Sequence, residues 1–173
     1  RLAAETADEA AGGRTFVKVA GVLGGRDQAL REAELAAALG YDVALLSLKG
    51  LDHMSEAELV RHAEAVSQVM PIMGFYLQTA VGGRRLSHAF WRDLAELPGL
   101  VGIKVAPFDR YATIDVVRAV AASSRADDVA LYTGNDDNIV VDLLTPFRVA
   151  VDGRVVEKRI VGGLLGQWAV WTR

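Results

Sequence analysis

The sequence predicts an α/β fold built on a parallel sheet. Short apolar runs rich in β-branched residues alternate with longer stretches of helical periodicity, and the apolar runs are nearly continuous. Strand–helix units of this length connect parallel strands, and continuous apolar runs are typical of strands buried on both faces. Because no linker, repeat or low-complexity tract interrupts the alternation, we expect a single domain covering residues 1–173.

The first predicted elements follow one another closely. Residues 1–11, rich in alanine and glutamate, are expected to end a helix, and residues 16–20 to form a strand. A helix over residues 26–39 comes next, and Gly40 suits the position just after its end. Its predicted apolar stripe consists of Leu30, Leu35, Ala38 and Leu39.

The central elements carry local signals at their ends. A second strand is predicted at residues 43–48 and a third at residues 72–77. Between them Ser55 begins a helix as its N-cap, because Glu58 three residues later completes a capping box, and Pro71 ends that helix. The remaining alternation comprises helices over residues 87–97, 113–122 and 135–144 and strands over residues 100–105 and 129–133.

The last part of the chain breaks this rhythm. Asp152 and Gly153 separate two short apolar runs at residues 147–151 and 154–157, and an Asp-Gly pair suits the type I′ turn of a hairpin. A final helix is expected from residue 162 to residue 173. Its apolar residues at helical spacing are Leu164, Leu165, Trp168 and Trp171.

Two α/β architectures are compatible with this pattern. An open doubly wound sheet suits a chain of 173 residues, whereas a (β/α)₈ barrel usually needs about 250 residues. The chain can therefore supply only part of such a barrel. In both architectures the chemistry lies at the carboxyl ends of the strands, which confines the search for a site.

The composition excludes several classes of protein. With 51% hydrophobic residues the chain is not disordered, and without cysteine it has no disulfide, thiolate metal site or cysteine nucleophile. The net charge of −3, with both signs well mixed, argues against a nucleic-acid partner. No apolar run is long enough to span a membrane and no signal peptide is visible, so we expect a cytoplasmic protein.

Lys104 is the leading candidate for chemistry. It lies near the carboxyl end of an apolar strand, where burial disfavours the charged amine and lowers its pKa. A neutral amine can attack a carbonyl group and form a Schiff base. Of the other lysines, Lys18 lies early in its strand and suits an ion pair, whereas Lys49 and Lys158 are expected to be solvated.

Tyr76 ends an apolar run 28 positions before Lys104, and its hydroxyl could relay protons near a nucleophilic amine. A buried aromatic with a satisfied hydroxyl is the structural alternative. With the Gly-Ile-Lys segment that ends at Lys104, this separation resembles the dihydrodipicolinate synthase / N-acetylneuraminate lyase family of class I aldolases. The segment Leu-Tyr-Thr-Gly-Asn-Asp-Asp over residues 131–137 is similar to the seventh-strand segment of that family.

The resemblance implies a (β/α)₈ barrel in which Lys104 forms a Schiff base with a 2-keto acid such as pyruvate and Tyr76 shuttles protons. It also implies substrate contacts from Gly134, Asn135 and Asp136, although capping of a helix is the simpler role for Asn135 or Asp136. Class I aldol chemistry requires no metal or other cofactor. The family also leads us to expect a homo-oligomer.

The sequence departs from the family in three places. No arginine follows Tyr76 at the family's offset, although Arg84 or Arg85 could substitute, and no Tyr-Tyr pair follows the strand at 43–48. No segment resembles the Thr-Thr-Gly-Glu of strand two. We therefore expect a divergent, incomplete barrel that covers about strands three to eight, lacks strands one and two, and is inactive by itself.

Three further readings are weaker. His53, His62 and His88 lack the spacing of a zinc site. The alternatives to an aldolase-type enzyme are an inactive barrel remnant or interaction module that self-associates through open sheet edges, and a phosphate or nucleotide binder. The last would use the glycine-rich turn at residues 21–25, which has neither the dinucleotide-binding spacing nor a P-loop lysine.

Overall fold

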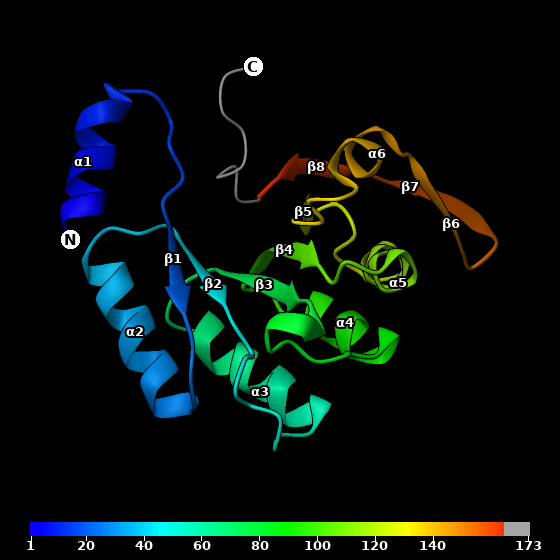
Figure 1. Cartoon of the computed structure of the whole chain (residues 1–173), viewed down its shortest axis with the longest axis horizontal. Helices are drawn as coiled ribbons and strands as arrows, with labels where there is room; N and C mark the ends of the chain where they lie inside the picture. The colour runs from blue at the N-terminus through cyan, green and yellow to red at the C-terminus, as the bar shows by residue number, and fades with distance from the viewer. Residues whose placement is uncertain (165–173) are drawn as a thin grey trace.

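Six parallel strands form one sheet in the computed structural model, which describes residues 1–164 (Figure 1). Across the sheet the order is β1-β2-β3-β4-β5-β8. Each strand therefore lies beside the preceding strand of the chain, apart from the hairpin inserted before β8. The strands are β1 (Val19–Val22), β2 (Val43–Leu46), β3 (Ile72–Leu77), β4 (Leu100–Ala106), β5 (Ala130–Thr133) and β8 (Ile160–Gly163).

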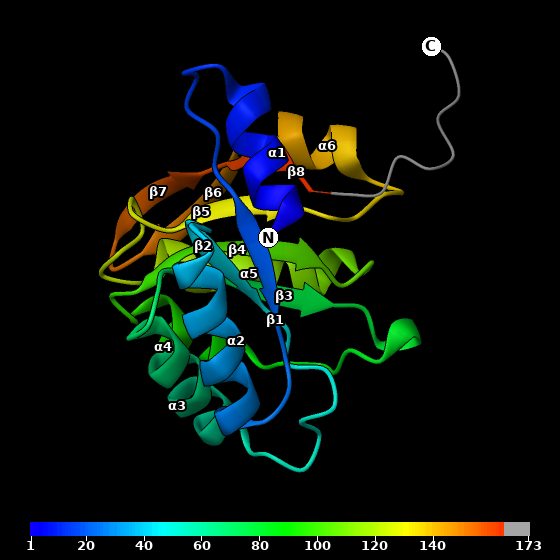
Figure 2. The same ribbon diagram turned by 90° about the vertical axis from the view of Figure 1, so that its left-hand side faces the viewer.

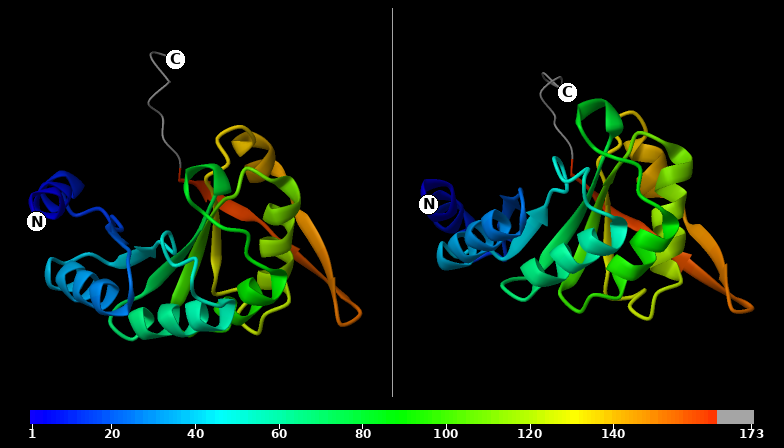
Figure 3. Two further views of the ribbon diagram at one scale, coloured as in Figure 1. Left: turned by 60° about the horizontal axis from the view of Figure 1, so that its bottom comes forward. Right: turned by 90° about the horizontal axis from the view of Figure 1, so that it is seen from below.

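Helices connect successive strands, as parallel pairing requires. Figure 3 shows α3, α4 and α5 along one side of the sheet. None of the helices within residues 1–164 is long and apolar enough to cross a membrane. The helices are α1 (Leu2–Ala11), α2 (Arg26–Ala38), α3 (Glu56–Ser67), α4 (His88–Ala95), α5 (Arg110–Ala121) and α6 (Ile139–Leu144), with a short 3₁₀ turn, η1 (Thr79–Val81).

The strand order distinguishes between the two predicted architectures. A doubly wound sheet reverses its strand order at a switch point, whereas a (β/α)₈ barrel adds each strand beside the last. The sequential order β1 to β5 is that of the barrel. The predicted parallel α/β fold is thus confirmed, with six strands in a sheet whose edges are β1 and β8.

Local signals placed the ends of several helices correctly. The Ser55 side chain accepts a hydrogen bond from the Glu58 backbone and the Glu58 carboxylate accepts one from the Ser55 backbone, which is the predicted capping box of α3. Ser87 caps α4. The start of α5 was predicted three residues too late, because Asp109 caps it by accepting hydrogen bonds from Tyr111 and Ala112.

The first strand and the buried face of α2 differ from the predictions. The strand begins at Val19, and Phe16, which the prediction included, has 61% of its surface exposed. In α2 the buried residues are alanines, whereas Leu35, predicted on the apolar stripe, is 60% exposed. Small side chains allow the helix to pack closely, and the leucines lie outside that contact. The buried residues of α2 are Ala29, Ala33 and Ala36.

The end of the chain combines a confirmed and a wrong prediction. The hairpin exists as β6 (Phe147–Val151) and β7 (Arg154–Lys158), with Asp152 and Gly153 at φ 47° and 76°, and it packs against α5 (Figure 2). The predicted final helix does not begin at Gly162, because this residue lies in β8. The remainder of that predicted helix, residues 165–173, lies outside the described residues.

The two faces of the sheet differ in burial. Gly74, Ile103 and Leu131 lie side by side on β3, β4 and β5 and are buried under the helices, and we call this side the helix-covered face. One position further along each strand, Phe75, Lys104 and Tyr132 lie side by side and are only partly buried. Because side chains alternate along a strand, these three point to the opposite side, which we call the open face.

Candidate active site

Lys104 lies on the open face, in the carboxyl-terminal half of β4 near the middle of the sheet. Its Nζ is 4.8 Å from the centre of the Phe75 ring on β3. On the other side its side chain passes over Gly134, where an added Cβ would lie 2.9 Å from Lys104 Cε and 2.9 Å from Ala106 Cβ. A glycine at position 134 therefore makes room for the lysine side chain.

Two opposing effects act on the Lys104 amine. Burial is the larger and lowers its pKa below the ordinary value, while the nearby Asp136 carboxylate raises it. The Phe75 ring also favours the ammonium form, since a cation is attracted to the face of an aromatic ring. The net effect is a larger fraction of neutral amine at a given pH than a solvated lysine has, as a nucleophilic lysine requires.

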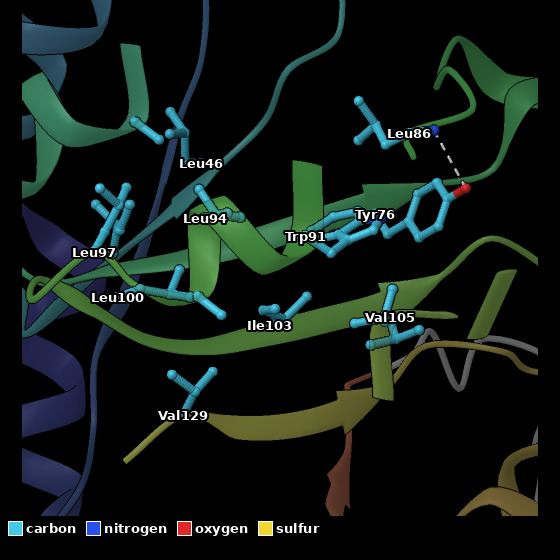
Figure 4. Packing of buried hydrophobic residues seen from close by; sticks show 14 of the residues in the cluster. Leu46, Tyr76, Leu86, Trp91, Leu94, Leu97, Leu100, Ile103, Val105 and Val129 are labelled. Atoms are coloured by element: carbon cyan, nitrogen blue, oxygen red, sulfur yellow. Dashed lines mark hydrogen bonds between the residues drawn. The ribbon is translucent and has the colours of Figure 1, made fainter. Parts of the chain in front are cut away.

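Tyr76 does not lie beside Lys104. It is in register with Val105, one position further along the strands, so its side chain points to the helix-covered face. Its ring packs against Trp91 with centroids 4.9 Å apart, and its hydroxyl accepts a long hydrogen bond of 3.5 Å from the Leu86 backbone (Figure 4). Burial raises the pKa of the Tyr76 hydroxyl. The structure therefore favours the alternative of a buried aromatic, and it separates Tyr76 from the amine.

Asn135 is also built into the core. Its amide donates hydrogen bonds to Thr113 Oγ1 at 3.1 Å and to Asp142 Oδ2 at 3.0 Å, and its Oδ1 accepts one from the Phe108 backbone. Both polar atoms of the Asn135 side chain therefore have partners in the core. The side chain does not cap α6, and it does not lie on the open face. The helix begins instead after Asn138. Of the three predicted substrate contacts, Gly134 and Asp136 lie close to Lys104 and Asn135 does not.

The polar cluster around Asn135 is centred on a buried carboxylate that the sequence did not reveal. Asp142 on α6 is fully buried. It pairs with Arg110 of α5 at 2.5 Å and accepts a hydrogen bond from Thr133 Oγ1 at 2.7 Å. These bonds join the end of β5 to both neighbouring helices, and they fix the loop that carries Gly134 and Asp136.

The other candidate residues have structural partners. Lys18 pairs with Asp8 of α1 at 2.6 Å, as predicted for an ion pair. The prediction that Lys158 is solvated is wrong, because its ammonium donates to the backbone oxygens of Ala126 and Val129. Burial lowers its pKa. Lys49 is exposed, as predicted.

Neither substitute arginine reaches Lys104 through a described contact. Arg84 donates to the Met54 backbone oxygen at 2.8 Å, and Arg85 pairs at the surface with Asp109 at 2.9 Å. In the glycine-rich turn after β1, the Leu23 amide donates to the Glu32 carboxylate at 2.9 Å. This carboxylate occupies a turn amide that a phosphate would need, which argues against a phosphate site there.

The histidines are not arranged as metal ligands. His62 of α3 is buried, and neither of its ring nitrogens has a hydrogen-bond partner in the structure of residues 1–164. No group of three or more His, Asp or Glu side chains in that part of the chain is placed to hold a metal ion.

Comparison with known proteins agrees with this architecture. Dihydrodipicolinate synthase from Bacteroides thetaiotaomicron superposes with a TM-score of 0.71 at 18% identity, over 95% of this chain and 50% of that chain. A prophage protein of the dihydrodipicolinic acid synthase family from E. coli K12, solved in complex with pyruvate, gives 0.67 at 21% identity, over 79% and 46%. The synthase from Oceanobacillus iheyensis gives 0.63 at 24% identity, over 79% and 43%.

The chain thus spans about half the length of these structures. Such identities establish the fold, and they confirm the prediction of part of a (β/α)₈ barrel. No curated protein matches the chain significantly in sequence. The model of the dihydrodipicolinate synthetase family, however, matches residues 2–155, which is most of the sequence. The chain therefore belongs to the dihydrodipicolinate synthetase family.

Proposed function

We propose that this chain carries the Schiff-base lysine of a class I aldolase-type lyase or synthase that acts on a 2-keto acid such as pyruvate, with Lys104 as the nucleophile. The single observation that carries the proposal is the position of Lys104. It is partly buried on the open face, near the carboxyl end of a central strand, between the Phe75 ring and Gly134. Strand ends of this kind hold the reacting groups of (β/α)₈ enzymes.

The chemistry follows from a neutral amine in this position. Lys104 attacks the keto carbon, and loss of water gives an iminium ion that withdraws electrons from the neighbouring carbon. The carbon–hydrogen or carbon–carbon bond next to the iminium can then break without a metal or an organic cofactor. The lowered pKa of Lys104 supports the first step, because only the uncharged amine attacks.

The relatives support the substrate class. The E. coli K12 prophage protein and the synthase from Acinetobacter baumannii were each solved with pyruvate. Gly134 and Asp136 remain the proposed substrate contacts, since both lie beside Lys104. The complete carbon–carbon reaction also needs groups that bind the rest of the substrate. The predicted inactivity of the chain by itself therefore concerns this complete reaction, and formation of the Lys104 adduct is tested separately. The homo-oligomer and the cytoplasmic location also stay predictions.

Borohydride trapping tests the proposal directly. The chain is incubated with pyruvate or a related 2-keto acid, reduced, digested and analysed by mass spectrometry. We expect one reduced adduct, on the peptide that contains Lys104, and none in Lys104→Ala. Lys49→Ala removes an exposed lysine and is the matched control that keeps the adduct. Absence of an adduct with every keto acid, or an adduct that persists in Lys104→Ala, would refute the proposal.

A barrel remnant that acts as an interaction module is the second candidate. It is favoured by the position of β1 at the sheet edge, next to exposed Phe16 and Val17. An unpaired edge beside apolar side chains can pair with another chain. This candidate predicts no adduct together with self-association that depends on concentration, measured by analytical ultracentrifugation.

A further inference from the structure

Schiff-base chemistry at Lys104, on which this inference rests, needs a group that moves protons. The carbonyl oxygen must be protonated twice before it leaves as water, and a carbon next to the iminium must lose a proton. Tyr76 cannot serve in the observed arrangement, because it lies on the helix-covered face with its hydroxyl directed at Leu86. The residue that takes its place beside Lys104 on β3 is Phe75, which has no hydroxyl.

A tyrosine lies on the other side of Lys104 instead. Tyr132 of β5 is in register with Lys104, just as Phe75 is on β3, so the three side chains form one row on the open face. Tyr132 is only partly buried, and its hydroxyl therefore differs in surroundings from the enclosed Tyr76. Tyr132 thus lies beside Lys104 on the open face, whereas Tyr76, the predicted relay, lies in the core.

The strand beyond Tyr132 is shaped to receive its ring. Gly162 of β8 is the next member of the row, and an added Cβ there would lie 3.1 Å from both Cδ1 and Cε1 of Tyr132. The absence of a side chain at Gly162 lets the ring lie against β8 and keeps it on the open face. The row across the sheet thus consists of the Phe75 ring, the Lys104 amine, the Tyr132 phenol and Gly162, which has no side chain.

The polar residues that follow Tyr132 in the sequence, Thr133 and Asn135, form hydrogen bonds within the core. Thr133 points to the helix-covered face and donates its hydroxyl hydrogen to Asp142. Asn135 is held by Thr113, Asp142 and the Phe108 backbone. A further polar group near Lys104 is the exposed carboxylate of Asp136, whose charge acts on the amine. Within residues 1–164 we therefore compare Tyr132, which is in register with Lys104, and Asp136, whose charge acts on it, as proton carriers.

We propose that Tyr132, and not Tyr76, is the catalytic hydroxyl that transfers protons at the Lys104 Schiff base. A phenol has a hydroxyl hydrogen that it can donate and later take back, and Tyr132 lies in register with Lys104 on the open face. The leaving oxygen needs a donor. Asp136 acts through its charge, by moderating the pKa of the amine.

The proton steps balance with this single carrier. Neutral Lys104 forms a bond to the keto carbon, and the carbonyl oxygen takes the Tyr132 proton. The phenolate recovers a proton from the new ammonium nitrogen, which gives a neutral carbinolamine. Tyr132 then protonates the hydroxyl group, the carbon–oxygen bond breaks, and water leaves an iminium ion. The phenolate finally removes a proton from the adjacent carbon to give the enamine. One amine and one keto acid yield one enamine and one water, without an oxidant or reductant.

The test separates Schiff-base formation from proton transfer. Pyruvate is incubated with the chain in deuterium oxide, and exchange of its methyl hydrogens is followed by NMR, alongside the borohydride adduct at Lys104. In Tyr132→Phe we expect the adduct to persist at long incubation, while methyl exchange slows by about 100-fold, at the lower end of what a positioned general acid–base group contributes. Tyr76→Phe and the surface control Tyr111→Phe are expected to exchange at the wild-type rate.

A relocated hydroxyl gives a second, independent readout. Phe75→Tyr places a phenol on the other side of Lys104, so the double variant Phe75→Tyr with Tyr132→Phe is expected to regain part of the exchange. A merely structural role of Tyr132 would not be rescued in this way. Circular dichroism establishes that each variant is folded.

The outcomes are distinct. Wild-type exchange in Tyr132→Phe, or a comparable loss in Tyr76→Phe, would each overturn the assignment while leaving the lysine chemistry intact. Absence of any adduct in the wild-type chain would overturn the lysine chemistry and with it the role of Tyr132.

Discussion

Residues that are neighbours in sequence lie on opposite faces of the sheet and differ in burial. On the helix-covered face Tyr76, Val105 and Thr133 form a row that is almost completely buried. One position earlier on the same strands, Phe75, Lys104 and Tyr132 form the partly exposed row of the open face. Because strand side chains alternate, a shift of one residue moves a hydroxyl from the partly exposed face beside Lys104 into the buried core. The helix-covered face contributes stability, and the open face holds the side chains that we propose to be reactive.

The largest effect on stability is expected from Trp91 on the helix-covered side. Trp91 is fully buried and packs against Tyr76 and Phe90, each with centroids 4.9 Å away. Trp91→Ala leaves a large cavity, and we expect it to lower the free energy of unfolding by about 4 kcal/mol, measured by urea denaturation. Tyr132→Phe on the open face is expected to change it by less than about 0.5 kcal/mol. Equal losses in the two variants would break the comparison.

The buried carboxylate of Asp142 comes next. Asp142→Ala leaves Arg110 without its partner and removes an acceptor from Thr133 and Asn135. We expect a loss of about 3 kcal/mol, because the buried donors of Thr133 and Asn135 lose their acceptor in the core, at about 1–3 kcal/mol for each unsatisfied group. Asp136→Ala, which removes an exposed carboxylate in the loop before α6, is the matched control and is expected to unfold at the wild-type urea concentration. A stable Asp142→Ala protein would contradict the role of this cluster.

His62 makes the helix-covered side sensitive to acid. Burial lowers the pKa of His62 below its ordinary value of 6.5, and the charge of Arg26 acts in the same direction. The unfolded chain therefore binds a proton on this residue at a higher pH than the folded chain does. We expect stability to fall as the pH drops below about 6.5, down to the lower pKa of the folded state.

Substitution separates this contribution from that of other groups. In His62→Leu the acid-induced loss of stability between pH 7 and pH 5 is expected to be smaller, as measured by urea denaturation at each pH. His88→Gln, which alters an exposed histidine, is expected to follow the wild-type pH dependence. An unchanged pH dependence in His62→Leu would show that the folded protein protonates this residue readily.

The smallest effect is expected on the open face, where it changes reactivity and not stability. The Asp136 carboxylate raises the pKa of Lys104, so Asp136→Asn lowers that pKa further. The rate of borohydride-trapped adduct formation, measured against pH, should then rise at a lower pH than in the wild type. A profile that moves to higher pH, or does not move, would show that the Asp136 charge does not raise the pKa of Lys104. The reactivity on the open face would then depend on Lys104 and its row alone.

Local signals explain which parts of the fold could be predicted. The capping box of Ser55 and Glu58, the Asp152-Gly153 turn and the limits of β3 depend on residues close in sequence. The buried alanine face of α2 could not be found in this way, since it is set by how closely the helix approaches its neighbours. Asp142 and Lys158 were missed for a similar reason, because their partners lie on other elements.

The candidate site shows the same division. Lys104 was identified from an amine in an apolar strand, and its family spacing pointed to a tyrosine nearby. The spacing alone did not distinguish Tyr76 from Phe75 at the sheet position next to the amine. The sequence does place Tyr132 and Gly134, two residues apart, on one face of their strand, but the position of Tyr132 beside Lys104 depends on the register between β4 and β5.

The sequence by itself determined the alternation of strands and helices, the parallel sheet and the lysine near the end of a central strand. These follow from periodicity and from chemistry that lies within a few residues. Only the tertiary structure decided which side chains share a face with that lysine, because the register between strands is fixed by packing across the whole sheet. That register placed Tyr76 in the core and Tyr132 beside the amine.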